Sequence, residues 1–200
     1  MASFKGKVFA ITGISGIGLS VAKQLRERGA LLSLADVNLK SLDEAFRQLG
    51  SNLDSVMTTV VDISKANEVN SWIEATVSKF DRLDGAANMA GVIGKHHGIR
   101  TITEQDDDEW DLIMRVNLTG LMYCLRAQLR NMSAGGSIVN AASVQGTMGF
   151  AKHAAYSASK HGVIGLTRSV AKESAPNVRV NAVAPYVQSA LIVENAAHSK

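Results

Sequence analysis

The sequence predicts an α/β fold in which one parallel β-sheet is doubly wound and carries helices on both faces. Short, largely apolar runs alternate with longer segments of helical periodicity along the whole chain. Such runs are typical of strands covered on both faces, and an alternating order of strands and helices gives a parallel sheet. The first run leads into the glycine-rich string TGISGIG, Thr12 to Gly18, and then into a helix. This order indicates a Rossmann-type sheet.

The first half of the chain contains three expected strands, each followed by a helix. Every strand is a short run that stops at a glycine or an aspartate, and the helices carry apolar residues three or four positions apart. Gly29 and Gly50 each follow a helical segment, where a left-handed glycine commonly ends a helix. We expect strands over 8–12, 31–35 and 56–61, and helices over 17–28, 39–49 and 65–80.

The second half repeats this order with longer pieces and an irregular stretch over 91–103. The acidic run from Asp106 to Glu109 suits the start of a helix, because the helix dipole favours negative charge there. Since no linker or internal repeat is visible, we predict a single domain over residues 1–200. We expect strands over 83–87, 136–141 and 178–183, and helices over 106–132 and 156–174.

The composition excludes several classes of protein. The 200 residues are 46% hydrophobic and carry a formal net charge of +3, from 21 basic and 18 acidic side chains. This charge is too small and too dispersed for nucleic-acid binding. No apolar stretch has the length of a membrane helix, and the start lacks the apolar core of a signal peptide. The single cysteine, Cys124, fits a reducing compartment. We therefore expect a cytoplasmic protein without a membrane or nucleic-acid partner.

Three histidines are candidate site residues. His96 and His97 are adjacent in the irregular stretch, but no further ligand has metal-binding spacing, so we expect no metal and a solvated loop. His153 precedes a candidate catalytic tyrosine by three residues. It lies either in a substrate pocket or on the surface.

The glycine-rich string predicts a phosphate-binding turn. Gly13, Gly16 and Gly18 let the backbone approach a pyrophosphate closely, and the helix that follows directs its N–H groups at the anion. Asp36 ends the second strand, 18 residues after Gly18, where a carboxylate binds the adenosine ribose. A 2′-phosphate would be repelled there, so we expect NAD rather than NADP. The alternative is an ordinary turn with a helix-capping aspartate.

Tyr156 and Lys160 are candidates for the reactive group. Their spacing of four places both side chains on one helix face. An ammonium and a cationic nicotinamide would lower the pKa of the tyrosine, which could then exchange a proton with a substrate oxygen. Ser143 could bind the same oxygen, and Asn117 could hold a water that links the lysine to solvent. The alternative is an exposed pair on a surface helix.

From Lys7 to about Ser189 the sequence resembles the short-chain dehydrogenase/reductase family. The resemblance implies that Tyr156 is the general acid/base, that Lys160 lowers its pKa and binds the nicotinamide ribose, that the serine orients the substrate, and that the asparagine supports a proton relay. It is carried by TGISGIG, Asp36, Asp62, the NMAG run from Asn88 to Gly91, Asn117 in VNLTG, Ser143, and YSASK from Tyr156 to Lys160.

The resemblance also implies a cofactor site and an assembly. Asp62 would bind the adenine. Family members usually pair two helices with their symmetry mates, so we expect a homodimer or homotetramer through the helices that begin at Asp106 and Tyr156. The implied cofactor contacts are Gly13, Ser15, Gly16, Ile17, Gly18, Asp36, Asp62, Ile63, Asn88, Ala90, Gly91, Tyr156, Lys160 and Pro185.

Three features depart from the family pattern. Two residues separate Gly13 from Gly16, where the family has three, and Tyr186 follows Pro185 where the family has a glycine. Either these loops are shorter than usual or the sequence lacks one residue at each. Family members also continue well beyond Lys200, so we expect the C-terminal part of the fold to be short or missing.

The leading hypothesis is an NAD(P)-dependent oxidoreductase, with NAD favoured, that transfers a hydride between nicotinamide and a small-molecule ketone or secondary alcohol. One alternative is a non-redox enzyme on the same scaffold, such as an epimerase, a dehydratase or a cyclase. Another is a truncated, non-catalytic dinucleotide-binding protein.

Overall fold

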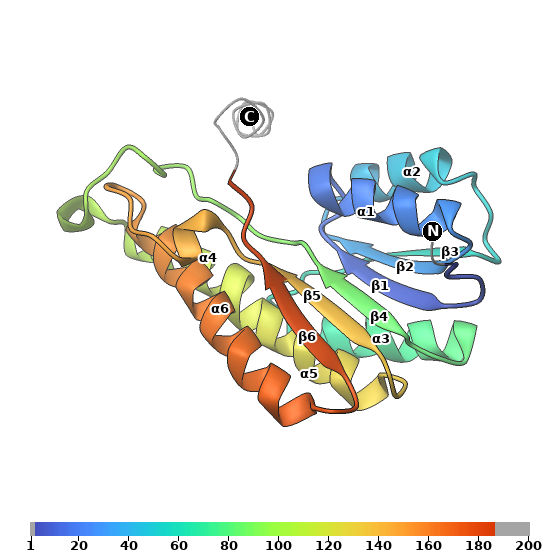
Figure 1. Cartoon of the computed structure of the whole chain (residues 1–200). Helices are drawn as coiled ribbons and strands as arrows, with labels where there is room; N and C mark the ends of the chain where they lie inside the picture. Colours follow the sequence, from blue (N-terminus) through green and yellow to red (C-terminus); the bar gives the residue numbers. More distant parts are fainter. Residues whose placement is uncertain (1–2, 187–200) are drawn as a thin grey trace.

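A computed structural model describes residues 3–186 and contains the predicted doubly wound parallel sheet (Figure 1). The strand order is β3-β2-β1-β4-β5-β6, and every neighbouring pair is parallel. Because the order reverses between β1 and β4, a ligand crevice is expected at the carboxyl ends of these strands. Of the residues in the family comparison above, 187–189 lie outside the described part of the chain.

The element bounds follow the sequence prediction closely, apart from the long helix. Gly29 and Gly50 have φ values of 87° and 93°, as expected of glycines that end helices. The strands are Val8–Thr12 (β1), Leu31–Asp36 (β2), Val56–Val60 (β3), Gly85–Asn88 (β4), Ser137–Ala141 (β5) and Arg179–Val183 (β6). The principal helices are Gly16–Glu27 (α1), Leu39–Gln48 (α2), Ala66–Phe80 (α3), Asp107–Met114 (α4), Leu121–Asn131 (α5) and Ala154–Ser174 (α6).

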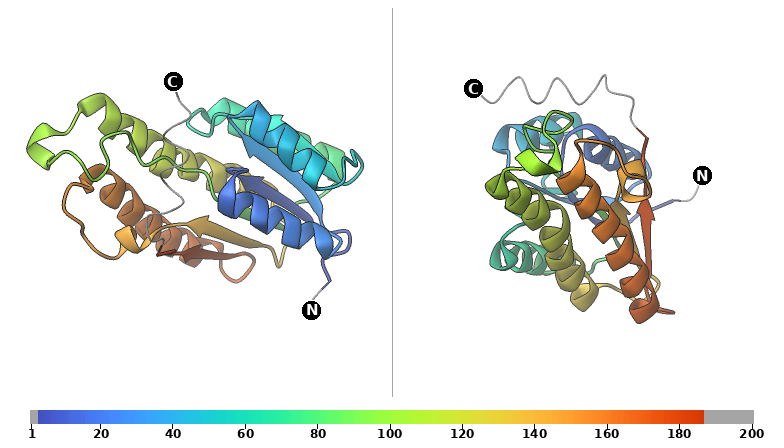
Figure 2. Two further views of the ribbon diagram at one scale, coloured as in Figure 1. Left: turned by 90° about the horizontal axis from the view of Figure 1, so that it is seen from above. Right: turned by 90° about the vertical axis from the view of Figure 1, so that its left-hand side faces the viewer.

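Helices form a layer on each side of the sheet (Figures 1 and 2). Side chains alternate between the two faces of each strand: Val8 of β1 belongs to one hydrophobic core, whereas Ile11 belongs to the other. Helices α1 and α2 cover the core around Ile11, and α3, α5 and α6 cover the core that contains the fully buried Trp72. The two layers hold the strand ends, and with them the site, in place.

The helix expected over 106–132 is not continuous. A π-helical segment, Arg115–Gly120 (η2), separates α4 from α5. Gly120 lies so close to Ile63 that a Cβ there would be 3.0 Å from the isoleucine backbone oxygen. Wider π turns occur inside α-helices and frequently mark functional sites, and this one contains Asn117.

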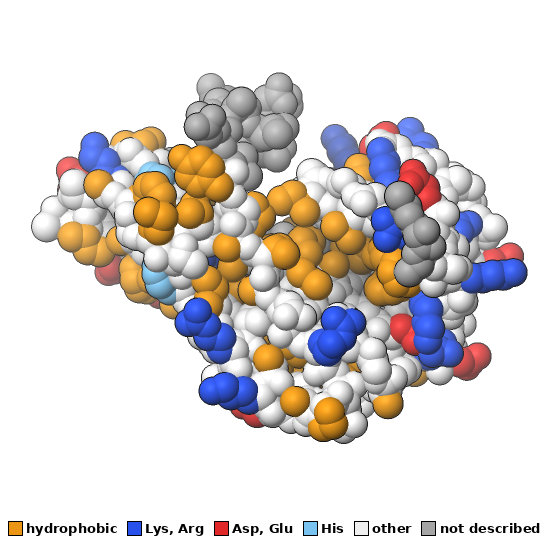
Figure 3. Space-filling model, viewed as in Figure 1, with side chains coloured by type: hydrophobic (Ala, Val, Ile, Leu, Met, Phe, Trp, Pro, Cys, Tyr) orange, Lys and Arg blue, Asp and Glu red, His pale blue; other side chains and the backbone are white. Residues whose placement is uncertain are grey.

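One part of the sheet is covered less than the rest. Among the described helices, none packs over β6 on the α1 side, and Val183 is 43% exposed there. Hydrophobic side chains gather in the middle of this face (Figure 3). Within residues 3–186, none of the helices has the length and hydropathy that a membrane span requires.

Candidate active site

The turn after β1 depends on glycine at two positions. Gly13 has a φ of 73°, and a Cβ there would lie 2.6 Å from the backbone nitrogen of Ala90. A Cβ at Gly18 would overlap the carbonyl oxygen of Gly13. Ser15 is the N-cap of α1, but its side chain makes no capping hydrogen bond. The first turn of α1 therefore keeps N–H groups available to an anion.

Asp36 ties the phosphate-binding turn to the end of β2. One carboxylate oxygen accepts a hydrogen bond from the Ile14 backbone at 2.6 Å, and the other accepts one from Asn38 at 2.9 Å. Asn38 in turn caps α2. The aspartate also lines a cavity of about 560 Å³, which we call the nucleotide cavity. The remaining lining comes from Gly13, Ala35, Val37, Val61, Asp62, Ile63, Ser64, Lys65, Ala90, Val92, Leu112, Arg115 and Val116.

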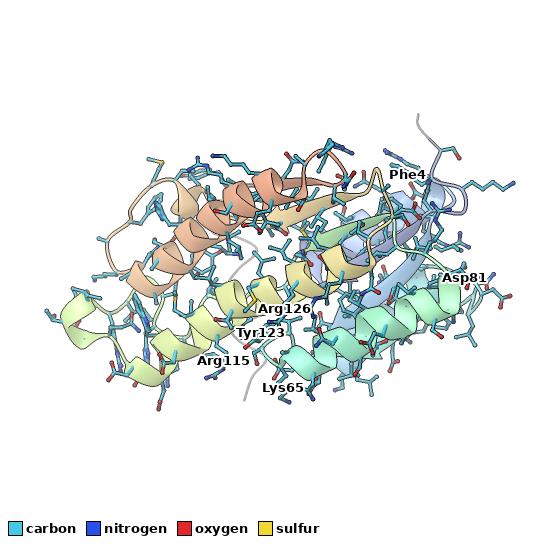
Figure 4. The ribbon with its side chains drawn as sticks, turned by 90° about the horizontal axis from the view of Figure 1, so that it is seen from below. Phe4, Lys65, Asp81, Arg115, Tyr123 and Arg126 are labelled. Atoms are coloured by element: carbon cyan, nitrogen blue, oxygen red, sulfur yellow. The ribbon has the colours of Figure 1, made fainter. Side chains whose placement is uncertain are left out.

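Asp62 holds the turn between β3 and α3. It accepts hydrogen bonds from the Ser64 backbone and hydroxyl at 3.0 and 2.7 Å. Burial raises the pKa of Asp62, but the bonds from Ser64 and the charge of Lys65 offset this and leave it below its usual value. Figure 4 shows Lys65 at the start of α3, with Arg115 on the neighbouring helix. The Lys65 ammonium forms an ion pair with the Glu68 carboxylate at 2.9 Å.

A second cavity of about 410 Å³, which we call the reaction cavity, is lined by Ser143, Tyr156 and Lys160. Tyr156 and Lys160 project from the first turns of α6, and Ser143 caps the short 3₁₀ segment after β5, Val144–Gly146 (η3). Lys160 is 4% exposed and donates to the Ala141 carbonyl at 2.7 Å. Burial lowers the pKa of Lys160 to about 8. The alternative of an exposed pair on a surface helix is therefore wrong.

The electrostatics of Tyr156 differ from the expectation. Burial raises the pKa of its hydroxyl, and the hydrogen bond with Ser143 offsets this only in part. The Lys160 ammonium, 5.5 Å from the ring centre, is directed at the Ala141 carbonyl and does not lower the tyrosine pKa. The expected lowering is therefore absent in the protein alone.

Asn117 fastens the π segment to the loop after β4. Its amide donates to the Val92 carbonyl at 2.8 Å and accepts from the Val92 N–H at 2.8 Å. It also donates to the Ser159 hydroxyl at 3.1 Å. A Cβ at Gly91 would lie 3.2 Å from the Asn117 oxygen and 3.5 Å from the Lys160 nitrogen. The glycine thus leaves open the space that these two polar groups share.

Asn88, an expected cofactor contact, is buried behind the cavities. Its amide exchanges hydrogen bonds with Gln128 at 3.0 and 2.8 Å and donates to Asn140 at 3.0 Å. Asn140 donates in turn to Thr167 of α6. Asn88 lines neither cavity, and its side chain instead joins β4 to β5 and α5.

The other predicted contacts divide between the two cavities. Ile63 and Ala90 line the nucleotide cavity, and Ile17, Gly91 and Pro185 line the reaction cavity. Residues 89–92 contribute to both, so the cavities adjoin the same loop. Ser15, Gly16 and Gly18 shape the start of α1 and line neither.

The aromatic side of the reaction cavity was expected only in part: of the two places considered for His153, the structure has the pocket. His97, expected in a solvated loop, is partly buried, and its ring centre lies 3.9 Å from that of His153 and 5.2 Å from that of Tyr156. Phe150 is 5.9 Å from His153 and nearly parallel to it. All four rings line the cavity. His96 is also partly buried and bonds to Glu109 at 2.9 Å. No metal-binding group of side chains occurs within residues 3–186.

Comparisons with known proteins agree with this geometry. A family model described as enoyl-(acyl carrier protein) reductase matches residues 12–200. Short-chain dehydrogenase/reductase ABA4 of Pyricularia oryzae is 58% identical over 183 residues, which are 90% of this chain and 68% of that protein. The crystal structure of levodione reductase has a TM-score of 0.85 and 37% identity, covering 91% of this chain and 72% of its own. NAD⁺-bound xylitol dehydrogenase also has a TM-score of 0.85, with 32% identity and coverage of 92% and 71%.

The family match extends over nearly the whole chain and includes both cavities. Relatives and structural neighbours are dehydrogenases and reductases, which supports the redox hypothesis over the two alternatives. The chain belongs to the short-chain dehydrogenase/reductase family and is an oxidoreductase of CH–OH and C=O groups that uses a nicotinamide cofactor.

Proposed function

We propose that this enzyme interconverts a small ketone and its secondary alcohol with NAD, and that Tyr156 exchanges the proton with the substrate oxygen. The observation that carries the proposal is the convergence of Tyr156, Ser143 and Lys160 in one cavity beside the nucleotide cavity. The nicotinamide supplies the chemistry of hydride acceptance or donation when it is bound.

The residues present fit a dinucleotide. Backbone contacts close enough to exclude a Cβ at Gly13 and Gly18 form the phosphate turn, and α1 begins directly after it. Asp36 and Asp62 lie in the nucleotide cavity, where they would hold the ribose and the adenine. Tyr156 and Lys160 would hold the nicotinamide ribose from the reaction cavity.

The protein residues divide the proton chemistry between them. In reduction of a ketone, the Tyr156 hydroxyl donates its proton to the carbonyl oxygen, which Ser143 orients by a hydrogen bond. In oxidation of an alcohol the same proton moves in the opposite direction. Once the cofactor is bound, the Lys160 ammonium, which is directed at the Ala141 carbonyl in the protein alone, would stabilise the phenolate that remains. Asn117 holds a water in the space left open by Gly91, so that the proton is replaced from solvent.

Asp36 carries the proposed preference for NAD. Its carboxylate lies in the nucleotide cavity and receives two backbone hydrogen bonds, which fix its position. A 2′-phosphate at this edge would face a negative charge of low mobility.

We expect the enzyme to work in the cytoplasm, in keeping with its single, buried cysteine.

We propose a homodimer or homotetramer through α4, α5 and α6. Val163 and Val170 of α6 belong to the core beneath the sheet, so this part of the helix serves packing within the chain. The assembly thus depends on the remaining helix surface and on what the family resemblance implies. Sedimentation as a monomer at micromolar concentration would contradict it.

An assay of NADH with a panel of ketones, and of NAD with secondary alcohols, tests the proposed function. We expect substrate-dependent loss or gain of the reduced-nicotinamide absorbance band. Absence of any change across the panel, in a protein that binds NADH by fluorescence titration, would refute hydride transfer to this class. A higher kcat/KM with NADPH would refute the role given to Asp36.

A further inference from the structure

One side of the reaction cavity is formed by three aromatic rings, which we call the ring wall: His97, Phe150 and His153. His153 lies between the other two, with ring centres at 3.9 Å to His97 and 5.9 Å to Phe150. His97 also meets the Tyr156 ring edge-on, at 5.2 Å and 79°. The ring wall is therefore in contact with the residue that exchanges the proton.

The ring wall is held by contacts between separate loops. The Gly98 N–H donates to the Lys152 carbonyl at 3.0 Å, which joins the loop of His97 to that of Phe150 and His153. Gly98 has a φ of 78° and packs against His153, from which a Cβ would be 3.2 Å distant. Figure 2 shows both loops at the same end of the molecule. Figure 3 shows histidine and hydrophobic side chains together at that end.

Glu109 of α4 fixes the loop from its other side. Its side chain is buried and accepts hydrogen bonds from the His96 backbone and from the His96 imidazole, both at 2.9 Å. Gly94, with a φ of 81°, lies so near this carboxylate that a Cβ would be 2.6 Å from it. Since His96 is held by main chain and side chain, the direction of His97 is fixed as well.

The charges in the reaction cavity favour an uncharged ligand. Lys160 is the only lining residue, among those described, that belongs to the Lys, Arg, Asp and Glu group, and its ammonium is committed to the Ala141 carbonyl. Burial and the neighbouring His153 lower the pKa of His97 to about 4, and burial lowers that of His153. Both imidazoles are therefore neutral at neutral pH. No free cation in the described lining can pair with a carboxylate or phosphate on the substrate.

We propose that the ring wall selects an uncharged, compact ring substrate, a cyclic ketone or cyclic secondary alcohol, and orients it beside Tyr156. Aromatic side chains bury a large apolar area when a ring packs against them. An open-chain ketone cannot make this contact as fully and loses more conformational freedom on binding. The inference rests on the proposed function and adds the substrate class to it.

The test compares cyclohexenone with methyl butyl ketone, which has the same number of carbon atoms but no ring, and with levulinate, a ketone that carries a carboxylate. We expect kcat/KM to be highest for cyclohexenone and lowest for levulinate. His97→Ala and Phe150→Ala should each lower the ratio of cyclohexenone to methyl butyl ketone by about three- to tenfold. His97→Phe, which keeps a ring, should retain the ratio. His161→Ala, at an exposed histidine of α6, is the matched control.

Binding is measured separately from turnover, by saturation-transfer NMR of cyclohexenone on a Tyr156→Phe protein with and without His97→Ala. Loss of the signal in the double variant would support the ring wall, whether or not any ketone is reduced. Absence of reduction for every ketone would refute the proposed function but not the ring wall. Reduction of methyl butyl ketone or levulinate as efficient as that of cyclohexenone, or a ratio unchanged by both alanine variants, would overturn the ring-wall proposal and leave hydride transfer standing.

Discussion

The nucleotide cavity and the reaction cavity lie at the same edge of the sheet but are built in different ways. Residues that directly follow β1, β2 and β3 form much of the first. Hydrogen bonds from the Ile14 N–H to Asp36 and from the Gly13 N–H to the Ala35 carbonyl join two of these strand ends. The second is completed by two irregular loops and the beginning of α6. Strand ends are positioned by the sheet itself, whereas the loops depend on particular side-chain contacts such as that of Glu109 with His96.

The sheet determines the geometry of the nucleotide cavity, whereas the geometry of the reaction cavity depends on its loops. A site made of strand ends and glycine turns keeps its geometry as long as the sheet forms, which suits a ligand of constant shape. A site made of loops can change its lining without disturbing the sheet. We therefore expect substitutions to affect the two cavities independently.

The largest effect should come from Tyr156→Phe, which removes the proton donor and leaves the nucleotide cavity intact. Loss of general acid–base catalysis should lower kcat by roughly 10²–10⁴, or about 3–5 kcal/mol of barrier. The Kd for NAD should be nearly unchanged, because Lys160 and the nucleotide cavity would still hold the cofactor. Steady-state assays and a fluorescence titration give the two values. Tyr123→Phe, on α5 beneath Arg126, is the matched control. A variant that keeps more than a tenth of the wild-type kcat would show that Tyr156 is not the proton donor.

Lys160→Met should lower activity, and it should also remove a pH dependence of the unfolding free energy. Burial lowers the pKa of Lys160 from 10.5 to about 8, so between these values the unfolded chain binds more protons than the folded one. Stability without cofactor must then rise with pH through this window, by at most about 3 kcal/mol. Two groups act in the opposite direction. Tyr156, whose pKa is raised above 10.0, does so only at the upper end, and Cys124, whose pKa burial raises from 9.0 to about 12, does so from about pH 9 upward. Both groups remain in Lys160→Met, so the difference between the two proteins reports the lysine. Calorimetric Tm values at pH 8 and 9.5 measure the rise; an equal rise in Lys160→Met would contradict its assignment to the lysine.

Asp36→Asn should change the nucleotide cavity and leave the reaction cavity unaltered. Removal of the negative charge, with Lys65 and Arg115 still in the cavity lining, should narrow the preference for NAD over NADP by about tenfold, or ~1.4 kcal/mol. The measurement is kcat/KM for both cofactors, with Asp43→Asn on the exposed side of α2 as control. A preference for cyclic ketones that changed together with the cofactor preference would disprove the separation of the two cavities.

The same difference explains which parts of the molecule the sequence predicted. Strand Val8–Thr12 and the residues Gly13 and Asp36 were found because their signals are local: an apolar run, a turn glycine and a strand-end acid. The break at Arg115–Gly120 was missed, since a single glycine such as Gly120 is tolerated inside a helix and only its packing against Ile63 shows why it is there. His97 was missed because its contact with His153 joins loops that are distant in sequence.

The smallest effect should come from Glu109→Gln, which tests whether the reaction cavity depends on a single contact. A carboxylate accepts hydrogen bonds from both the His96 N–H and the His96 imidazole, whereas an amide offers one acceptor oxygen. Replacing a charged partner by a neutral one should cost about 1 kcal/mol of unfolding free energy. Glu109→Ala removes both bonds and should cost about 1–3 kcal/mol, because the His96 N–H loses its buried acceptor. Chemical denaturation gives these values.

The pH dependence identifies the carboxylate itself as the source of this effect. Burial raises the pKa of Glu109, but the hydrogen bonds from His96 outweigh it and hold the pKa below 4.5. A folded-state pKa below the unfolded one adds stability that is fully present above 4.5 and is lost as the pH falls through the folded value. The wild type should therefore lose more stability than Glu109→Gln on acidification below pH 4.5, whereas Asp108→Asn, exposed on the same turn, should follow the wild type. Equal acid sensitivity in Glu109→Gln and the wild type would mean that the loop of His97 is held by other contacts, and that Glu109 does not position the ring wall.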